Sequence, residues 1–313
     1  MTDDTADWRD LSAAEVERLA ELRAADSLAD LVALTDPEDE HGAYFAAKRE
    51  WYDLRGRELA GTETSEGIPG NAVTVDGSTF HVHGITHADT DAERSYLQGR
   101  VRDLVDAGAV VYCEQGVRSM YFRAFPAVCE MDDYRWAMAE CERLDVDSHV
   151  ADLEFDGVAE EVDSLTDRFR EAAFSLVDSG SDLYGEQFRT ALGDVASSLL
   201  TSHEAMATGK DFEAFVRRQA AATDPDRLAD LQGYYERRFL PQPVEREWLR
   251  RHDPELELVT HARNERMADY AVYHADAPEV HLLVGAAHQP GVTYYLERYR
   301  DGDRELGAFE PSG

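Results

Sequence analysis

Lysine is almost absent from this chain of 313 residues. Lys48 and Lys210 are the only two, and 31 basic side chains stand against 65 acidic ones, which gives a formal charge of −34. Phosphate binding needs concentrated positive surface, so the composition predicts that nucleic acid is not a partner. The acidic residues are spread through apolar, periodic segments, which indicates an adaptation of the whole surface rather than an acidic tail.

That adaptation suits molar salt. Carboxylates hold water and cations well, whereas long lysine stems expose apolar area. Salt at about 1 M shortens the Debye length to about 3 Å and removes much of the self-repulsion that this charge would cause. We therefore expect an acidic protein from an extreme halophile such as a halophilic archaeon.

Cysteines and long apolar runs are also scarce. Cys113, Cys129 and Cys141 are odd in number and show no CxxC spacing, so neither a disulfide framework nor a thiolate zinc site is indicated. No apolar run approaches the roughly 20 residues of a membrane span. The acidic N-terminus lacks the basic flank and apolar core of a secretory signal, so we expect a cytoplasmic protein with no membrane partner.

The periodicity of the chain changes along its length. Residues 8–60 have a helical pattern, with a capping box at Ser12 and Glu15. After a loop, the stretch AVTVDGSTFHVHG alternates around Asp76-Gly77, which is typical of a β-hairpin. A helix over 91–107 and a short buried strand, AVVYCEQG, then complete a strand-helix-strand unit.

The second half of the chain repeats this arrangement. A largely helical pattern fills about 151–252, and then come a helix over 258–274, the strand EVHLLVG over 279–285 and a helix over 291–299. We expect an α/β fold with a single core. A small sheet built from two strand-GxxH-helix units should carry a helical insertion at about 151–252 and a helical N-terminal segment. The predicted organisation is a segment over 1–70 packed on a domain over 71–313.

Two turns with the same pattern carry the chemistry. The stretches TFHVHGITH and EVHLLVGAAH each lead a strand into Gly-x-x-His, and they place His87 and His288 at strand ends. Side chains at the carboxyl ends of neighbouring parallel strands converge, and Glu114 ends the strand between them in sequence. Two imidazoles and a carboxylate either hold a divalent metal such as Mn²⁺, Co²⁺ or Zn²⁺, or activate water without one.

Together with ARNERMADY and the tail VGAAHQPGVTYYLERYRDG, these turns resemble the TraB/Tiki/GumN family. The resemblance covers residues 78–125 and 258–302. It implies a fold shared with erythromycin-esterase-like and ChaN-like proteins, a group that includes metal-dependent peptidases, metal-free esterases and a haem binder.

By position, the resemblance makes His87, Glu114 and His288 the catalytic or metal-binding residues. It also matches Arg263 and Asn264 to the family's Arg-Asn pair, with Arg263 as an anion contact and Asn264 as a substrate contact. The function expected is hydrolysis of a small-molecule or peptide substrate, by a metallopeptidase-like, amidase-like or metal-free esterase-like reaction. The alternative is a non-catalytic module that binds a ligand, a metal or haem in the same pocket.

Further candidates have weaker support. His81 and His83 share one strand face, and His83 is predicted to contact substrate. Arg118, on a segment after Glu114, is predicted to line the rim. His281 begins the last strand, remote from its carboxyl end, and is interpreted as structural. The H-x-H pattern also occurs in amidohydrolases and metallo-β-lactamases, but the regular repeats and the aspartate of those folds are missing.

Overall fold

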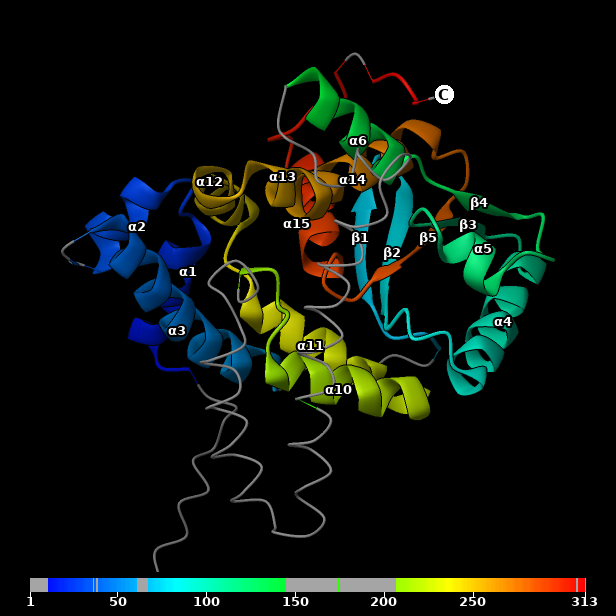
Figure 1. Ribbon diagram of the computed structural model, residues 1–313, viewed down its shortest axis with the longest axis horizontal. Helices are drawn as coiled ribbons and strands as arrows, with labels where there is room; N and C mark the ends of the chain where they lie inside the picture. Colours follow the sequence, from blue (N-terminus) through cyan, green and yellow to red (C-terminus); the bar gives the residue numbers. More distant parts are fainter. Residues whose placement is uncertain are drawn as a thin grey trace, which may run out of the picture.

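The computed structural model describes residues 11–35, 37, 39–60, 67–144, 174, 207–307 and 309–312. The first three helices form a layer of their own (Figure 1): α1 (Ala13–Arg23), α2 (Leu28–Thr35) and α3 (Glu40–Leu59). The capping box predicted at the start of α1 is confirmed, because the Ser12 hydroxyl accepts from Glu15 N–H and the Glu15 carboxylate accepts from Ser12 N–H.

A buried ion pair joins this helical layer to α12 (Gln242–His252). Lys48 on α3 donates to Glu245 across 2.8 Å, and Tyr44 donates to the same carboxylate across 2.6 Å. Trp248 stacks on Tyr44, with 4.7 Å between the ring centroids. One of the two lysines of the chain thus lies inside the protein, where burial lowers its pKa to about 8.

A five-stranded sheet forms the centre of the α/β part. Its strands are β1 (Asn71–Val75), β2 (Ser78–Ile85), β3 (Val110–Cys113), β4 (Val128–Glu130) and β5 (Glu279–Gly285). The spatial order is β1-β2-β5-β3-β4, with β1 antiparallel to β2 and the other neighbours parallel. The predicted hairpin is confirmed, and its turn residues Asp76 and Gly77 both have positive φ.

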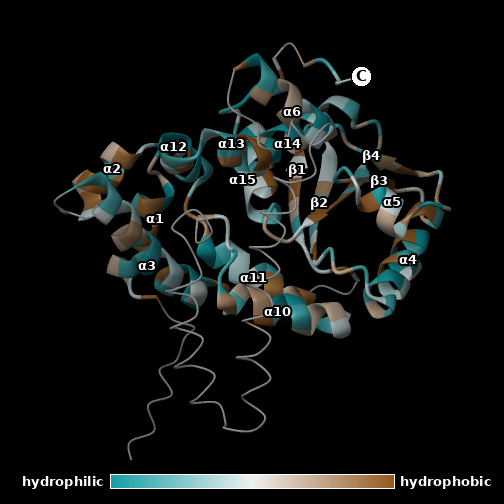
Figure 2. Cartoon of the chain, viewed as in Figure 1, coloured by the Kyte–Doolittle hydropathy of each residue, from teal (hydrophilic) through white to brown (hydrophobic). Residues whose placement is uncertain are grey.

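Helices cover both faces of this sheet. On one face α14 (Arg263–His274) and α15 (Gln289–Arg300) bury an apolar cluster with Val82, Leu282 and Val284. On the other face α4 (Asp91–Asp106) and α5 (Val117–Tyr121) pack over Val111 and Leu283. Figure 2 shows hydrophobic residues on the strands and a mixture of hydrophilic and hydrophobic residues on the helices around them. The predicted α/β class is therefore confirmed.

The expected helical insertion at about 151–252 is described in its last part only. Within the insertion, residues 151–173 and 175–206 lie outside the described residues. After them come α10 (Phe212–Thr223), the 3-10 turn η2 (Pro225–Arg227), α11 (Leu228–Arg238) and α12. The described part is helical, as predicted, and α11 packs against α3, β2 and α15. It therefore links the N-terminal helices to the sheet.

The helix expected to begin at 258 begins earlier. Asp253 caps a helical run by accepting from Leu256 N–H, and Pro254 occupies its first turn. The run passes through α13 (Pro254–Glu257) and a π-helical turn, η3 (Leu258–Ala262), into α14. Arg263 and Asn264 lie inside this continuous run, at the start of α14. A helix α6 (Asp133–Arg143) follows β4 and packs beside them.

Within the part of the chain that the structure describes, no helix has both the length and the apolar character needed to cross a membrane.

Candidate active site

Three side chains meet at the edge of the sheet where β2, β5 and β3 end. His87 follows β2, Glu114 follows β3 and His288 follows β5. His87 Nε2 lies 3.4 Å from Glu114 Oε2, and His288 Nε2 lies 3.6 Å from Glu114 Oε1. A methyl group on Gly285 would lie within 3.5 Å of an atom of each of the three. The structure thus brings together the residues that the two matching turns and the strand between them single out.

Glu114 is held as a buried carboxylate. Its Oε1 accepts from Arg263 Nη2 across 2.7 Å, and its Oε2 accepts from Gly285 N–H across 2.7 Å. Burial raises the pKa of Glu114, but the neighbouring histidines, Arg263 and the Gly285 N–H outweigh it and lower the pKa to about 2. The carboxylate is therefore charged throughout the physiological range.

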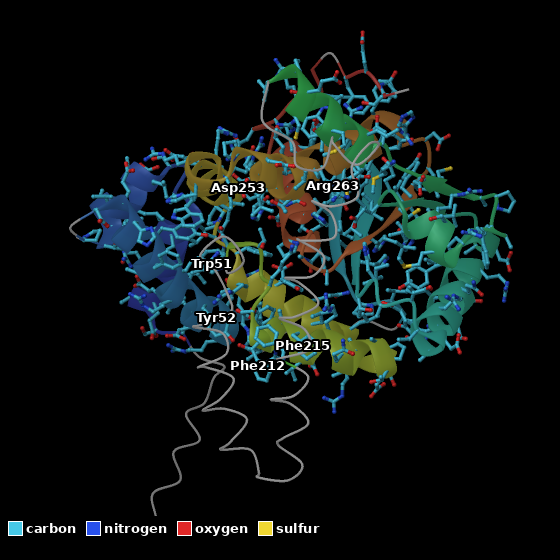
Figure 3. The ribbon with its side chains drawn as sticks, viewed as in Figure 1. Trp51, Tyr52, Phe212, Phe215, Asp253 and Arg263 are labelled. Carbon is cyan, nitrogen blue, oxygen red and sulfur yellow. The ribbon has the colours of Figure 1, made fainter. Side chains whose placement is uncertain are left out.

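Arg263 binds two carboxylates rather than facing open space. Its Nε donates to Asp133 Oδ2 across 2.9 Å, its Nη2 donates to Glu114, and its Nη1 donates to Val259 O across 3.2 Å. Asp133 also accepts from Gln115 N–H across 3.0 Å. Figure 3 shows Arg263 between the sheet and the helices that cover it. The predicted role as an anion contact does not match these partners, since all three guanidinium nitrogens already donate to Asp133, Glu114 or the Val259 carbonyl.

His288 has a defined tautomer. Asn264 Nδ2 donates to Gln242 Oε1 across 2.9 Å, so its Oδ1 is the acceptor that lies 2.7 Å from His288 Nδ1. His288 therefore carries its hydrogen on Nδ1, and its Nε2 presents a lone pair towards Glu114. Burial lowers the pKa of His288 to about 3, because the opposing effect of Glu114 is smaller. Asn264, predicted to contact substrate, instead orients this imidazole.

The turn that carries His87 is held in an unusual conformation. His87 has φ 59° and Asp89 has φ 54°, both in the left-handed region that non-glycine residues rarely adopt. The buried carboxylate of Glu93 accepts from Thr86 N–H across 2.7 Å and from Ala88 N–H across 3.3 Å. The Tyr121 hydroxyl accepts from Asp89 N–H across 2.9 Å and donates to Glu93. This network fixes the backbone on both sides of His87.

Two predicted site residues lie elsewhere. His83 lies within β2, where its Nδ1 is 3.0 Å from Pro69 O and its Nε2 is 2.9 Å from His281 Nδ1. It was predicted to contact substrate because it shares a strand face with His81, but it lies before the strand end at which the others meet. Arg118 donates to Val128 O across 3.0 Å, so its Nε supports β4 rather than the space over Glu114.

Three residues of the site escaped the sequence reasoning. Asp133 shares Arg263 with Glu114, Glu93 holds the His87 turn, and Gln242 orients Asn264. Glu93 stands three residues after Thr90, which is the spacing of an ordinary helix cap, and the Thr90 hydroxyl does accept from Glu93 N–H. Asp133 begins a helix, where an acidic residue is also expected from the dipole. Neither position carries a sequence signal for its second role.

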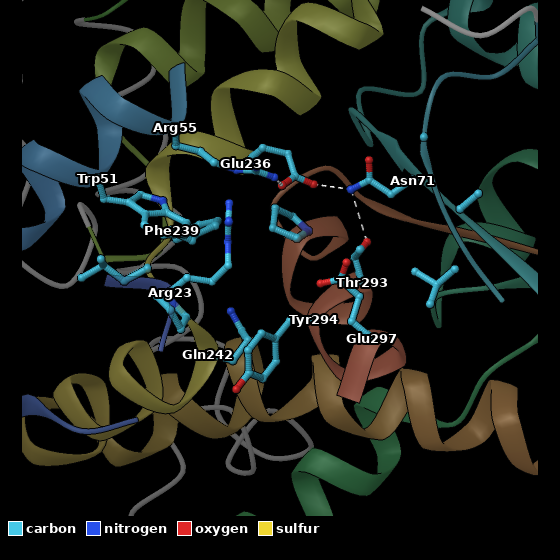
Figure 4. A pocket seen from close by; sticks show the side chains of 16 residues that line it. Arg23, Trp51, Arg55, Asn71, Glu236, Phe239, Gln242, Thr293, Tyr294 and Glu297 are labelled. Atoms are coloured by element: carbon cyan, nitrogen blue, oxygen red, sulfur yellow. Dashed lines mark hydrogen bonds and ion pairs between the residues drawn. The ribbon is translucent and has the colours of Figure 1, made fainter. Parts of the chain in front are cut away.

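A cavity of about 350 Å³ lies between α3, α11 and α15 (Figure 4), with Trp51 and Glu236 in its wall. Gln242 also lines it. Because Gln242 accepts from Asn264, which in turn accepts from His288, two hydrogen bonds connect the cavity wall to the site.

The three residues do not form a ready metal site. Among the described residues, the group whose ligand atoms all lie within 4.8 Å of one another is His81, Glu279 and His281. Glu114 already pairs with the Arg263 guanidinium, and a divalent cation bound to the same carboxylate would be repelled by it. The donor set therefore suits a metal poorly.

No family model matches this chain, and no curated protein and no solved structure matches it either. The function is therefore argued from the geometry of the site.

Proposed function

We propose that this protein is a hydrolase that activates water at His288 without a metal, and that it cleaves an ester or amide bond of a small-molecule or peptide substrate. The observation that carries the proposal is the fixed tautomer of His288, whose Nε2 lone pair lies 3.6 Å from the Glu114 carboxylate. That distance is too long for a direct hydrogen bond, and a water molecule suits the space near both groups. The resemblance to the TraB/Tiki/GumN family points to the same class of reaction.

The proton moves to His288. A water molecule that donates to His288 Nε2 loses a proton as its oxygen attacks the substrate carbonyl, and the imidazole becomes an imidazolium. Its Nδ1–H stays bonded to Asn264 throughout. Since burial disfavours the charged imidazole, the ring gives the proton up readily to the leaving group, which completes the cycle.

Glu114 supplies charge rather than taking the proton, because both of its carboxylate oxygens already accept a hydrogen bond, one from Arg263 and one from Gly285 N–H. With a pKa of about 2 it remains an anion, and it stabilises the imidazolium that forms 3.6 Å away. His87 lies on the other side of the carboxylate, and its Nε2 is buried with no hydrogen-bond partner. An unpaired buried nitrogen at this place suits a contact to the substrate oxygen.

The test is turnover of a chromogenic ester and a chromogenic aminoacyl amide in molar KCl. His288→Asn keeps a side-chain amide in place of the ring and should lower kcat at least about 100-fold, which is the usual contribution of a general base. His274→Asn, on α14 away from Glu114, is the matched control and should retain full turnover. Turnover of His288→Asn within tenfold of the parent would contradict the assignment.

A chelator separates the two chemistries. Treatment with EDTA followed by desalting should leave turnover unchanged. Loss of turnover that Mn²⁺, Co²⁺ or Zn²⁺ restores would favour the metal-dependent reaction instead. If the parent turns over neither substrate but binds a ligand that His87→Ala no longer binds, the protein is a binding module.

A cytoplasmic location belongs to the same proposal, because the lysine-poor, acidic composition suits molar salt inside the cell.

A further inference from the structure

A second cluster of imidazoles lies on the face of the sheet that α4 covers. His81 on β2 and His281 on β5 are direct neighbours in the parallel register, and their rings stack with 4.5 Å between centroids and 10° between planes. Glu279, two residues before His281, places its Oε2 2.6 Å from His81 Nε2. One ligand atom from each of the three lies within 4.8 Å of the others. The cluster is separate from Glu114, since His281 precedes the strand end at Gly285 by about 13 Å of extended chain.

A chain of hydrogen bonds fixes which nitrogen of His281 is free. Pro69 O can only accept, so His83 Nδ1, 3.0 Å away, carries a hydrogen. His83 and His281 are both buried, which disfavours a charged imidazole. His83 Nε2 is therefore an acceptor, and His281 Nδ1 donates to it across 2.9 Å. His281 Nε2 is left with a lone pair, as a metal ligand requires.

The surroundings suit an ion with an open coordination position. A cavity of about 280 Å³ is lined by His81, His83 and His281 together with Arg100 and Asp103. His281 and His83 are buried, whereas Glu279 is exposed and its carboxylate can move. Solvent therefore reaches one side of the cluster, and the buried rings supply a rigid wall on the other.

We propose that His81 Nε2, His281 Nε2 and the Glu279 carboxylate bind one divalent transition-metal ion, best Zn²⁺, with a water from the cavity as the fourth ligand. Zn–N bonds of about 2.0 Å place tetrahedral ligand atoms about 3.3 Å apart. The 2.6 Å contact between His81 Nε2 and Glu279 therefore opens, and the other ligand separations, at most 4.8 Å, close. The half-buried His81 ring turns out of its stack on His281, so that both nitrogen lone pairs point at the ion. His81 Nε2 donates to the Glu279 carboxylate, which can only accept, so the hydrogen of His81 moves to Nδ1 when Nε2 binds the ion. His83 Nε2 accepts the Nδ1–H of His281 and so orients that ring, which is the usual support of a metal-bound imidazole.

Such an ion would connect the two strands whose ends carry His87 and His288. It would hold β2 and β5 together from a place remote from the reaction, and so act on stability and on the alignment of the site.

The experiment uses the full chain without a histidine tag, in molar KCl, and measures zinc by elemental analysis after exposure to Zn²⁺ and desalting. We expect one zinc per chain in the parent and in the double variant His87→Ala, His288→Ala, which lacks the first site. The ligand changes Glu279→Gln, at an exposed residue, and His81→Asn, at a half-buried one, should fold normally and weaken zinc binding at least about tenfold in a calorimetric titration. Glu17→Gln, an exposed change on α1, is the matched control and should bind as the parent does.

Three results would overturn the proposal. They are no zinc in the parent at saturating Zn²⁺, unchanged affinity in both Glu279→Gln and His81→Asn, or loss of the zinc in the His87→Ala, His288→Ala variant. Co²⁺ provides an independent reading, because a four-coordinate site with two imidazoles gives visible absorption bands. These bands should disappear in His81→Asn and persist in the double variant. The outcome is independent of turnover, so it does not depend on the hydrolase proposal.

Discussion

Replacing Arg263 by Met removes the cation that two buried carboxylates share. Glu114 is 4% exposed and Asp133 is fully buried, and the guanidinium donates to both. Removing one partner of a buried ion pair costs about 3–5 kcal/mol, because the charge left behind has no water around it. Here two carboxylates are left, and Glu114 already raises the pKa of Asp133 in the parent. We therefore expect the free energy of unfolding of Arg263→Met to fall by at least about 3 kcal/mol at pH 7.5.

The loss should depend on pH with a definite sign. Without Arg263, the folded-state pKa values of Glu114 and Asp133 are higher than in the parent, because a cation that lowers both is lost. The folded variant then takes up protons more readily than the folded parent, so its deficit relative to the parent is largest at high pH and shrinks as the pH falls through the raised values. Protonation of the two carboxyl groups removes the repulsion that the substitution creates.

The assay is urea unfolding in molar KCl, followed by circular dichroism at pH 7.5 and 5.5. Arg300→Gln is the matched control: Arg300 is exposed and pairs with Asp301 across 2.8 Å, so its loss should cost less than about 1 kcal/mol. If Arg263→Met does not fold, Arg263→Lys keeps the charge without the planar fork and should show a smaller loss. A deficit under about 1 kcal/mol at pH 7.5, or one that is equal at both pH values, would refute the reasoning.

Four further predictions follow from the site and the composition. Gly285→Ala should lower turnover at least about tenfold with little change in melting temperature. Its methyl group would lie 3.4 Å from Glu114 Oε2 and His87 Nε2, which is an ordinary contact that fills the reaction space. Unchanged turnover would place the reaction elsewhere. Tyr121→Phe should cost about 1–3 kcal/mol in urea unfolding, because Asp89 N–H loses its acceptor, and a smaller cost would mean that water replaces the hydroxyl. Burial lowers the pKa of His288 below the 6.5 of the unfolded chain, so its contribution to stability is complete above pH 6.5 and is lost as the pH falls towards 3. The urea midpoint of the parent should therefore be lower at pH 5.5 than at pH 7.5, and equal midpoints would contradict this. Dialysis to low salt should remove the helical circular dichroism, and an unchanged spectrum would argue against adaptation to molar salt.

The sequence predicted those features of the fold that local pattern decides. Alternation and the Asp76-Gly77 turn marked the hairpin, and the strand EVHLLVG over 279–285 was predicted with the bounds that β5 has. The helical period of 91–107 matches α4 within one residue. The short strand β4 was missed, because three residues are too few to show alternation.

The candidate site was predictable where strand ends alone determine it. His87, Glu114 and His288 each follow a strand, and parallel neighbours bring their ends together. Asp133 was not predictable, since its contact with Arg263 depends on how α6 packs against α14. The pairing of His81 with His281 depends on the register between β2 and β5, which no local pattern encodes.

The place of β5 in the sheet affects how the protein can fold during its synthesis. It pairs on one side with β2 and on the other with β3, and contacts such as that between His83 and His281 join residues 198 positions apart. During synthesis, β2 and β3 are made long before β5, which lies between them in the sheet. They do not pair with each other. The sheet therefore assembles after synthesis has passed residue 285, and folding should be slow for a chain of this size because its central contacts are so distant in sequence.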